Sequence, residues 1–306
     1  MMCRREHYSC VAAAIFAIAA SSHCLARKYP VQPDDVGLKG AGIGYQDLKV
    51  YPASGRIYLK SGVYELMDFR GPVDITEDNV TFRKCRFFWE NFREQSIITQ
   101  FNGRKHSNIV LEDCEVDGNG YRVSGMVGGK DLTLSRCYIH NGGDDLIKIR
   151  DGLSMDRCWL GPTIYAKGAH SDIMQMGTTL VDKSSPLVKV TNTTVFAFDI
   201  KGEHRVNNVF AFGNSLPIRY VITDNWFRGA GYQVSIGSPQ TNAESFLIFR
   251  NNLMQDAKFG FMYPSEKGYI NCDWSGNRNE QGELISTNDP DRLTNGRKGK
   301  IPAQTR

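Results

Sequence analysis

Two short segments of this chain carry residue types that could do acid, base or metal chemistry. Segment 140–150 reads HNGGDDLIKIR and segment 168–176 reads GAHSDIMQM, so each combines a glycine turn, aspartate and a run of alternating residues. Asp144, Asp145 and Asp172 offer carboxylates that can act as acid, base or calcium ligands. Lys148 offers a cation and His170 a group that titrates near neutrality. The two segments therefore predict a functional site if the fold brings them together.

A repeat along the chain supplies the elements that would position these residues. Seven stretches align in one frame: 80–87, 109–116, 132–139, 153–160, 188–195, 220–227 and 247–254. Each reads apolar, any, apolar, two polar, then a small residue and a further apolar position, which indicates a short strand that bends and continues. The small residues are Cys85, Cys114, Cys137, Cys158, Thr193, Asn225 and Asn252. Their spacing predicts an all-β solenoid with one coil per repeat.

The repeat also predicts how the two segments stack. Aligning their strands puts Asp145 over Asp172 and Lys148 over Gln175, with the apolar residues between them pointing inward. The lysine, Arg150 and Gln175 then face outward as a surface groove. Counting eight residues beyond Cys114 adds Arg122 to the same row.

Two carboxylates held on neighbouring coils repel one another. One of them must be protonated or a cation must lie between them, and that cation could be Arg122, Lys148 or calcium. We therefore expect Asp144, Asp145 and Asp172 to be possible calcium ligands. Lys148, His170, Asp145 and Asp172 are the predicted catalytic residues.

A second group lies on the next coil and could extend the groove. His204 and Arg205 belong to it, and the ring of Tyr232, like that of Tyr263, could stack on sugars or simply pack on the surface. We interpret His106 and His140 as loop or turn residues.

The four aligned cysteines should form a ladder inside the coils. We expect buried thiols, with a disulfide between neighbouring coils as the alternative. Asn225 and Asn252 at the same bend should bond to the backbone of the adjacent coil.

Composition and the termini predict export. A charged start, a short apolar run and Cys24-Leu25-Ala26 match a signal peptide over residues 1–26, and no later run is long enough to anchor the chain in a membrane. Removing the signal peptide lowers the formal charge from +4 to +3. This mild positive charge suits an acidic glycan, and the sequence lacks the clusters of basic residues that nucleic-acid binding requires.

We predict a secreted or periplasmic monomer with a leader over 27–49, a β-helix domain over 50–286 and a disordered basic tail over 287–306. Residues 37–78 should form an irregular first coil that caps the solenoid end.

The repeat, with Cys, Thr and Asn aligned at one bend, resembles the right-handed parallel β-helix of the pectate lyase superfamily. Residues 50–280 carry this resemblance, and the paired segments resemble secreted bacterial β-helix proteins. They depart from polygalacturonases, because the Asn-Thr-Asp turn and the Arg-Ile-Lys signature are absent, and from calcium pectate lyases, because no cluster of acidic ligands follows on consecutive strands. Segment 141–149 is similar to a signature of alginate and chondroitin lyases, without the partner lysine motif.

Three functions are compatible with these residues. The first is a polysaccharide lyase that cleaves a uronic-acid-containing glycan by β-elimination, with Lys148 or His170 as base and Arg150, Arg205 or calcium holding the substrate carboxylate. The second is a glycoside hydrolase that uses paired aspartates. The third is a β-helix protein that binds a glycan without cleaving it.

Overall fold

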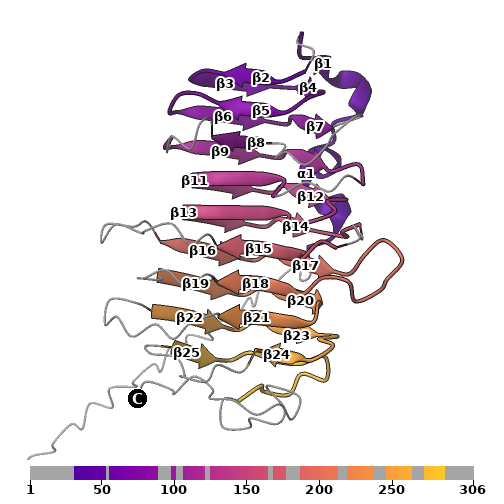
Figure 1. Cartoon of the computed structure of the whole chain (residues 1–306), viewed down its shortest axis with the longest axis vertical. Helices are drawn as coiled ribbons and strands as arrows, with labels where there is room; N and C mark the ends of the chain where they lie inside the picture. The colour runs from indigo at the N-terminus through magenta and orange to yellow at the C-terminus, as the bar shows by residue number, and fades with distance from the viewer. Residues whose placement is uncertain are drawn as a thin grey trace, which may run out of the picture.

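Nearly all of the regular secondary structure in the described chain is parallel β-structure, stacked as Figure 1 shows. The computed structural model describes residues 31–52, 55–88, 98–100, 106–120, 125–164, 168–176, 187–212, 219–236, 246–263 and 272–286. Its strands form three columns, and a coil is defined here as consecutive strands that take one place in each column. The predicted all-β, parallel architecture is confirmed.

The strands of each column pair in register with the same place in the next coil. The first column contains β2 (Ile57–Leu59), β5 (Val73–Ile75), β8 (Ile98–Gln100), the start of β11 (Val127–Ser135), the start of β13 (Ile147–Asp156), β15 (Asp172–Met176), β18 (Asn208–Phe212), β21 (Tyr232–Ile236) and β24 (Gly260–Met262). The second contains β3 (Gly62–Glu65), β6 (Val80–Arg83), β9 (Ile109–Glu112), the ends of β11 and β13, β16 (Val188–Thr191), β19 (Arg219–Thr223), β22 (Phe246–Arg250) and β25 (Cys272–Ser275). The third contains β1 (Lys49–Val50), β4 (Met67–Phe69), β7 (Arg86–Phe88), β10 (Glu115–Asp117), β12 (Tyr138–His140), β14 (Trp159–Leu160), β17 (Thr194–Ala197), β20 (Trp226–Gly229) and β23 (Leu253–Gln255).

Alternation along each strand separates the core from the outer surface. In β6, for example, Val80 and Phe82 are fully buried while Arg83 is exposed. Because successive side chains point to opposite faces, the inward positions of every coil stack into one continuous apolar core. Outward positions on neighbouring coils lie side by side, so short rows of polar residues can gather on the surface.

The bend between the second and third columns uses one backbone conformation again and again. The residue before each ladder position has a positive φ, as at Lys84 (52°) and Asn251 (55°). Such a left-handed residue turns the chain sharply, and polar side chains tolerate this conformation better than branched ones.

The ladder itself is confirmed. Oδ1 of Asn252 accepts the backbone N–H of Asn225 at 3.0 Å, and Nδ2 of Asn252 donates to the Ile222 carbonyl at 3.1 Å. Four cysteines, Cys85, Cys114, Cys137 and Cys158, are buried free thiols at the same bend. The side chain of Cys272 lies outside the described residues.

The segment that precedes the first coil differs from the expectation. It contains two 3-10 turns, Pro33–Asp35 and Tyr45–Asp47, and the short helix α1 (Gly37–Gly40). Of the predicted capping region, β2 and β3 do begin the stack, but this segment does not join them. The N–H of Gly37 donates to the Arg136 carbonyl at 2.7 Å, so the segment lies against the third column beside β12 (Figure 1). Val36 and Leu38 are buried there, and this apolar contact holds the segment on the side of the stack.

The structure does not describe the predicted signal peptide or the predicted tail. Within the residues that it does describe, no helix is long and apolar enough to cross a membrane.

Candidate functional site

Asp145 and Asp172 lie side by side on neighbouring coils, where the chain enters two strands of the first column, β13 and β15. Strands β13 and β15 pair Ile147 with Met174 and Lys148 with Gln175, as predicted. The backbone N–H of Asp172 donates to Oδ1 of Asp145 at 2.9 Å. The two residues are only 2% and 1% exposed, so both carboxyl groups are shielded from water.

Lys148 supplies the cation that this carboxylate pair requires. Its Nζ lies 3.1 Å from Oδ2 of Asp145, and its side chain is about one-third exposed. The lysine stem folds over Gly125, where an added Cβ would come within 2.7 Å of the Lys148 Cβ. The glycine therefore leaves the space in which the lysine reaches Asp145.

Asp172 is the member of the pair whose ionisation is unfavourable. The pKa of its carboxyl is raised to about 6, because burial and the charge of Asp145 raise it by more than the hydrogen bond from Asn208 and the nearby His170 lower it. Nδ2 of Asn208 donates to Oδ1 of Asp172 at 2.8 Å. Oδ2 is buried and has no hydrogen bond among the described residues.

His170 covers that remaining oxygen. Its Nδ1 lies 3.7 Å from Oδ2 of Asp172, which is an ion-pair distance and longer than a hydrogen bond. The histidine side chain is 74% exposed. The arrangement is thus an accessible imidazole placed over a buried carboxylate, with an ammonium group close by.

The register corrects the predicted row. Val127 pairs with Ile147, and the N–H of Met126 donates to the Asp145 carbonyl at 3.2 Å, so Gly125 and not Arg122 takes the place across from Asp145. Arg122 lies outside the described residues, as does the side chain of Arg150. Gln175 is half-buried on the outer face, as predicted.

The second predicted group makes its shown contacts with its own turn and the following coil. Arg205 forms an ion pair with Glu203 at 2.7 Å. His204 packs edge-on against Phe198, and its Nδ1 lies 3.3 Å from the Ala230 carbonyl. These contacts turn both side chains toward their own turn and the following coil.

The prediction that Tyr232 presents its ring to a sugar is wrong. Tyr232 is 6% exposed, because the rings of Phe259 and Tyr263 cover it at centroid distances of 5.7 and 5.1 Å. These aromatic residues belong to the next coil, and they bury that position. Asn208, in contrast, contacts the site and was not among the predicted site residues.

The predicted calcium ion gains no support from this donor set. Calcium takes about six to eight oxygen ligands. Both oxygens of Asp145 are already engaged, by an N–H and by Lys148, and one oxygen of Asp172 accepts from Asn208. Lys148 already compensates the charge of Asp145.

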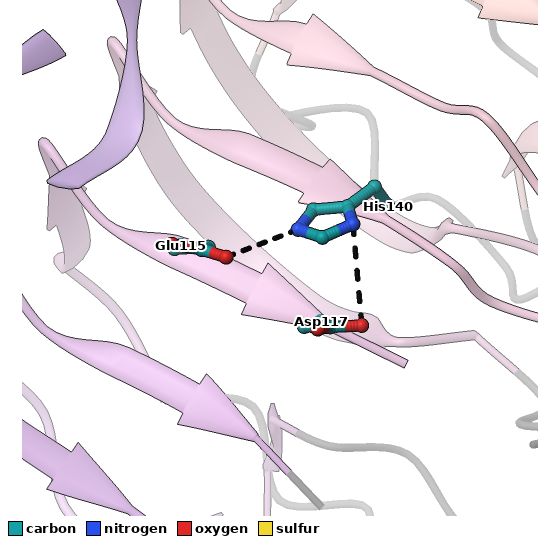
Figure 2. Close-up of side chains that lie close together, drawn as sticks. All are labelled: Glu115, Asp117 and His140. Atoms are coloured by element: carbon teal, nitrogen blue, oxygen red, sulfur yellow. Dashed lines mark hydrogen bonds and ion pairs between the residues drawn. The ribbon is translucent and has the colours of Figure 1, made fainter. Parts of the chain in front are cut away.

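A second cluster lies on the outer face of the third column, beneath the N-terminal segment. Figure 2 shows His140 between Glu115 and Asp117, with Nε2 3.2 Å from Glu115 and Nδ1 3.9 Å from Asp117. The hydroxyl of Tyr45 donates to the same Glu115 oxygen at 2.8 Å. Within the described residues, Glu115, Asp117 and His140 are the one set of three such side chains whose ligand atoms all lie within 4.8 Å.

This cluster ties the N-terminal segment to the stack. The imidazole uses both of its nitrogens, one toward each carboxylate, and its ring stacks on Tyr138 at 3.8 Å. Tyr45 reaches the cluster from the segment, 70 residues away in sequence. The interpretation of His140 as a loop residue is therefore wrong: it is a buried residue of β12, and the ladder register could have shown that it lies beside Asp117.

Glu115→Gln is expected to lower stability at neutral pH and to matter less in acid. Burial raises the pKa of Glu115, but the hydrogen bonds from His140 and Tyr45 outweigh it, so the net pKa is lowered. A lowered folded-state pKa stabilises the protein above the unfolded value and loses this effect as the pH falls through the folded value. Thermal unfolding of both proteins from pH 7 to pH 3 should show melting temperatures that converge, and a constant difference would contradict the assignment.

The geometry of Asp145, Lys148, His170 and Asp172 is thus the feature from which a function must be inferred. Comparison of the chain with protein-family models, with curated proteins and with solved structures finds no match.

Proposed function

We propose that this protein is a secreted polysaccharide lyase that cleaves a uronic-acid-containing glycan by β-elimination. The observation that carries the proposal is the exposed imidazole of His170 above the buried carboxylate of Asp172, with the ammonium of Lys148 on the neighbouring coil. β-Elimination requires a base for the proton next to the uronate carboxylate and a cation that stabilises the charge developing on that carboxylate. The exposed groups of the site are one base and one cation.

In the proposed step, Nε2 of His170 removes the proton from the carbon that bears the carboxylate. The electron pair of that C–H bond forms the new carbon–carbon double bond, and the bond to the glycosidic oxygen on the next carbon breaks. The imidazolium or water returns a proton to the leaving oxygen. Asp172 orients Nδ1 of the ring and stabilises its protonated form, as a buried carboxylate beside a catalytic histidine does.

The same geometry is less suited to glycoside hydrolysis. A hydrolase needs two carboxyl groups that reach opposite sides of the scissile bond. Asp145 and Asp172 are both buried and face each other's backbone and neighbouring side chains. The group that reaches solvent beside Asp172 is the imidazole of His170.

We propose that the coils wind as a right-handed parallel β-helix like that of the pectate lyase superfamily, since connections between parallel strands of one sheet are nearly always right-handed. The predicted signal peptide supports export, and an acidic polysaccharide is the proposed partner.

The direct test is turnover of a panel of acidic bacterial and plant polysaccharides, with and without a chelator. A lyase releases an unsaturated uronate that absorbs ultraviolet light, and we expect this product from at least one glycan and no effect of the chelator. New reducing ends without the unsaturated product would instead establish a hydrolase. Binding without either product would establish the non-catalytic alternative.

Lys148→Ala is expected to lower kcat/KM by roughly 10²-fold, because a positioned cation that stabilises developing charge contributes about that much. Lys148→Arg should retain part of the activity, since it keeps the charge. The fold should persist, which circular dichroism can check. Turnover at the wild-type rate in Lys148→Ala would show that the lysine has no role in catalysis.

A further inference from the structure

Lys148 belongs to a row of outward positions that runs along the first column. Pairing in register places Lys148 beside Gln175 and Gln175 beside Ala211. Ala211 then pairs with Ser235. The N–H of Tyr263 donates to the Val234 carbonyl at 2.8 Å, which continues the row to Tyr263 one coil further. This row from Lys148 to Tyr263 is called the strip.

The strip combines one cation, a neutral floor and one exposed ring. Gln175, Ala211 and Ser235 are half-buried and uncharged, and two of them are small. Tyr263 is 45% exposed, and the edge-to-face contact of its ring with buried Tyr232 holds it in place. Coils in such a stack repeat at about 4.8 Å, so Tyr263 lies roughly 19 Å from Lys148, four coils away. In Figure 1 the distance runs from β13 down to β24.

We infer that the strip binds an extended glycan chain lying along the stack, with the cleaved uronate at Lys148 and a sugar ring stacked on Tyr263. The inference rests on the proposed function and adds a direction and a minimum length to the substrate. Binding sites combine aromatic surface with a few placed polar groups, and the strip has this composition. A tyrosine ring gives a flat apolar face with a polar tip, which suits the apolar face of a sugar.

The opposite direction along the same row crosses an ion pair and so lacks the neutral floor of the strip. From Lys148 it passes Gly128 and reaches Asp74, a buried carboxylate bonded to Arg56 at 2.6 Å, before it ends at Tyr58. Tyr58 is 55% exposed and lies four coils from Lys148, as Tyr263 does. It is therefore a matched control: the same residue type in the same row at the same distance, but beyond the Asp74–Arg56 ion pair.

The experiment measures how affinity depends on chain length. Uronate oligosaccharides of increasing length, prepared from the glycan that is turned over or bound most tightly in the panel, are titrated calorimetrically into the full chain carrying His170→Ala, which should bind without cleaving. We expect affinity to rise with length and then level off. Adding Tyr263→Ala should remove the last rise, a loss of roughly two- to tenfold in affinity, whereas Tyr263→Phe and Tyr58→Ala should keep it.

Each outcome separates the strip from the proposed chemistry. One outcome is that the wild type cleaves the glycan, but the rise of affinity with chain length is unchanged by Tyr263→Ala or is lost in Tyr58→Ala. This outcome overturns the strip as a binding site and leaves the lyase activity standing. A length dependence that requires Tyr263, without turnover by the wild type, overturns the lyase and leaves the strip. If no uronate oligosaccharide binds or is cleaved, both are overturned.

Discussion

Asp172→Asn is expected to abolish most of the activity and yet to make the protein more stable above pH 6. The structural reason is that the folded protein holds a carboxylate in a place that opposes its ionisation. The pKa of Asp172 is raised from 3.8 to about 6, chiefly by burial. Asparagine keeps the acceptor for Asn208 and carries no charge, so it removes the cost of ionising a buried group.

The sign of the effect follows from proton linkage. Between pH 4 and pH 6 the folded state binds more protons at Asp172 than the unfolded state does, so stability falls as the pH rises through that window. The full cost is present above pH 6 and amounts to roughly 3 kcal/mol at this pKa difference. Urea unfolding at pH 7.5 should show Asp172→Asn to be more stable by roughly 1–3 kcal/mol, and at pH 4 the two proteins should be nearly equal.

Activity should move the other way. Without the carboxylate, His170 loses the group that orients its Nδ1, and we expect kcat to fall by roughly 10²-fold or more. In the wild type, activity should rise through about pH 6 as Asp172 ionises. A variant that is both stable and fully active would show that Asp172 is only a structural turn residue.

Much of this site could be predicted from the sequence because the strands are regular. The alternating residues of 147–149 and 174–176 determine one pairing, and that pairing brings Asp145 to Asp172 and Lys148 to Gln175. Wherever both partners lie in strands with an unmistakable inward pattern, the positions of neighbouring residues follow.

The wrong prediction of the row, with Arg122 across from Asp145, comes from connections between strands whose length varies. Placing Arg122 by counting from Cys114 assumed a constant bend, but Val127 follows Cys114 by 13 residues, whereas its partner Ile147 follows Cys137 by 10. Local pattern contains no information on that difference.

Contacts between segments that are distant in the sequence could not be predicted from it either. The Tyr45 hydroxyl meets Glu115 only because the N-terminal segment lies along the third column. Tyr232 is buried only because Phe259 and Tyr263 of the next coil cover it. Both depend on how segments pack after the strands have formed, and neither leaves a periodic signal.

The largest effect on stability is expected from Asn252→Ala in the ladder at the bend. Asn252 is 1% exposed and lies between two other ladder asparagines, Asn225 and Asn277. Its Oδ1 accepts the N–H of Asn225 and its Nδ2 donates to the Ile222 carbonyl. Alanine removes the side-chain amide and with it both hydrogen bonds. The buried backbone groups that lose their partner cannot reach water, so we expect a loss of about 3–5 kcal/mol in the free energy of unfolding.

Cys114→Ala is the matched control at the other end of the same ladder. The thiol of Cys114 is also fully buried, but its contacts are weak ones, to the Glu112 and Phe82 carbonyls at 3.3 and 3.5 Å and to the neighbouring ladder thiols. Its removal leaves a small cavity and should cost about 1 kcal/mol. Chemical unfolding of the two variants therefore separates two roles within one row: hydrogen bonding holds the asparagine coils together, whereas packing holds the cysteine coils. Equal losses would show that the asparagine side chains, too, act only by filling space.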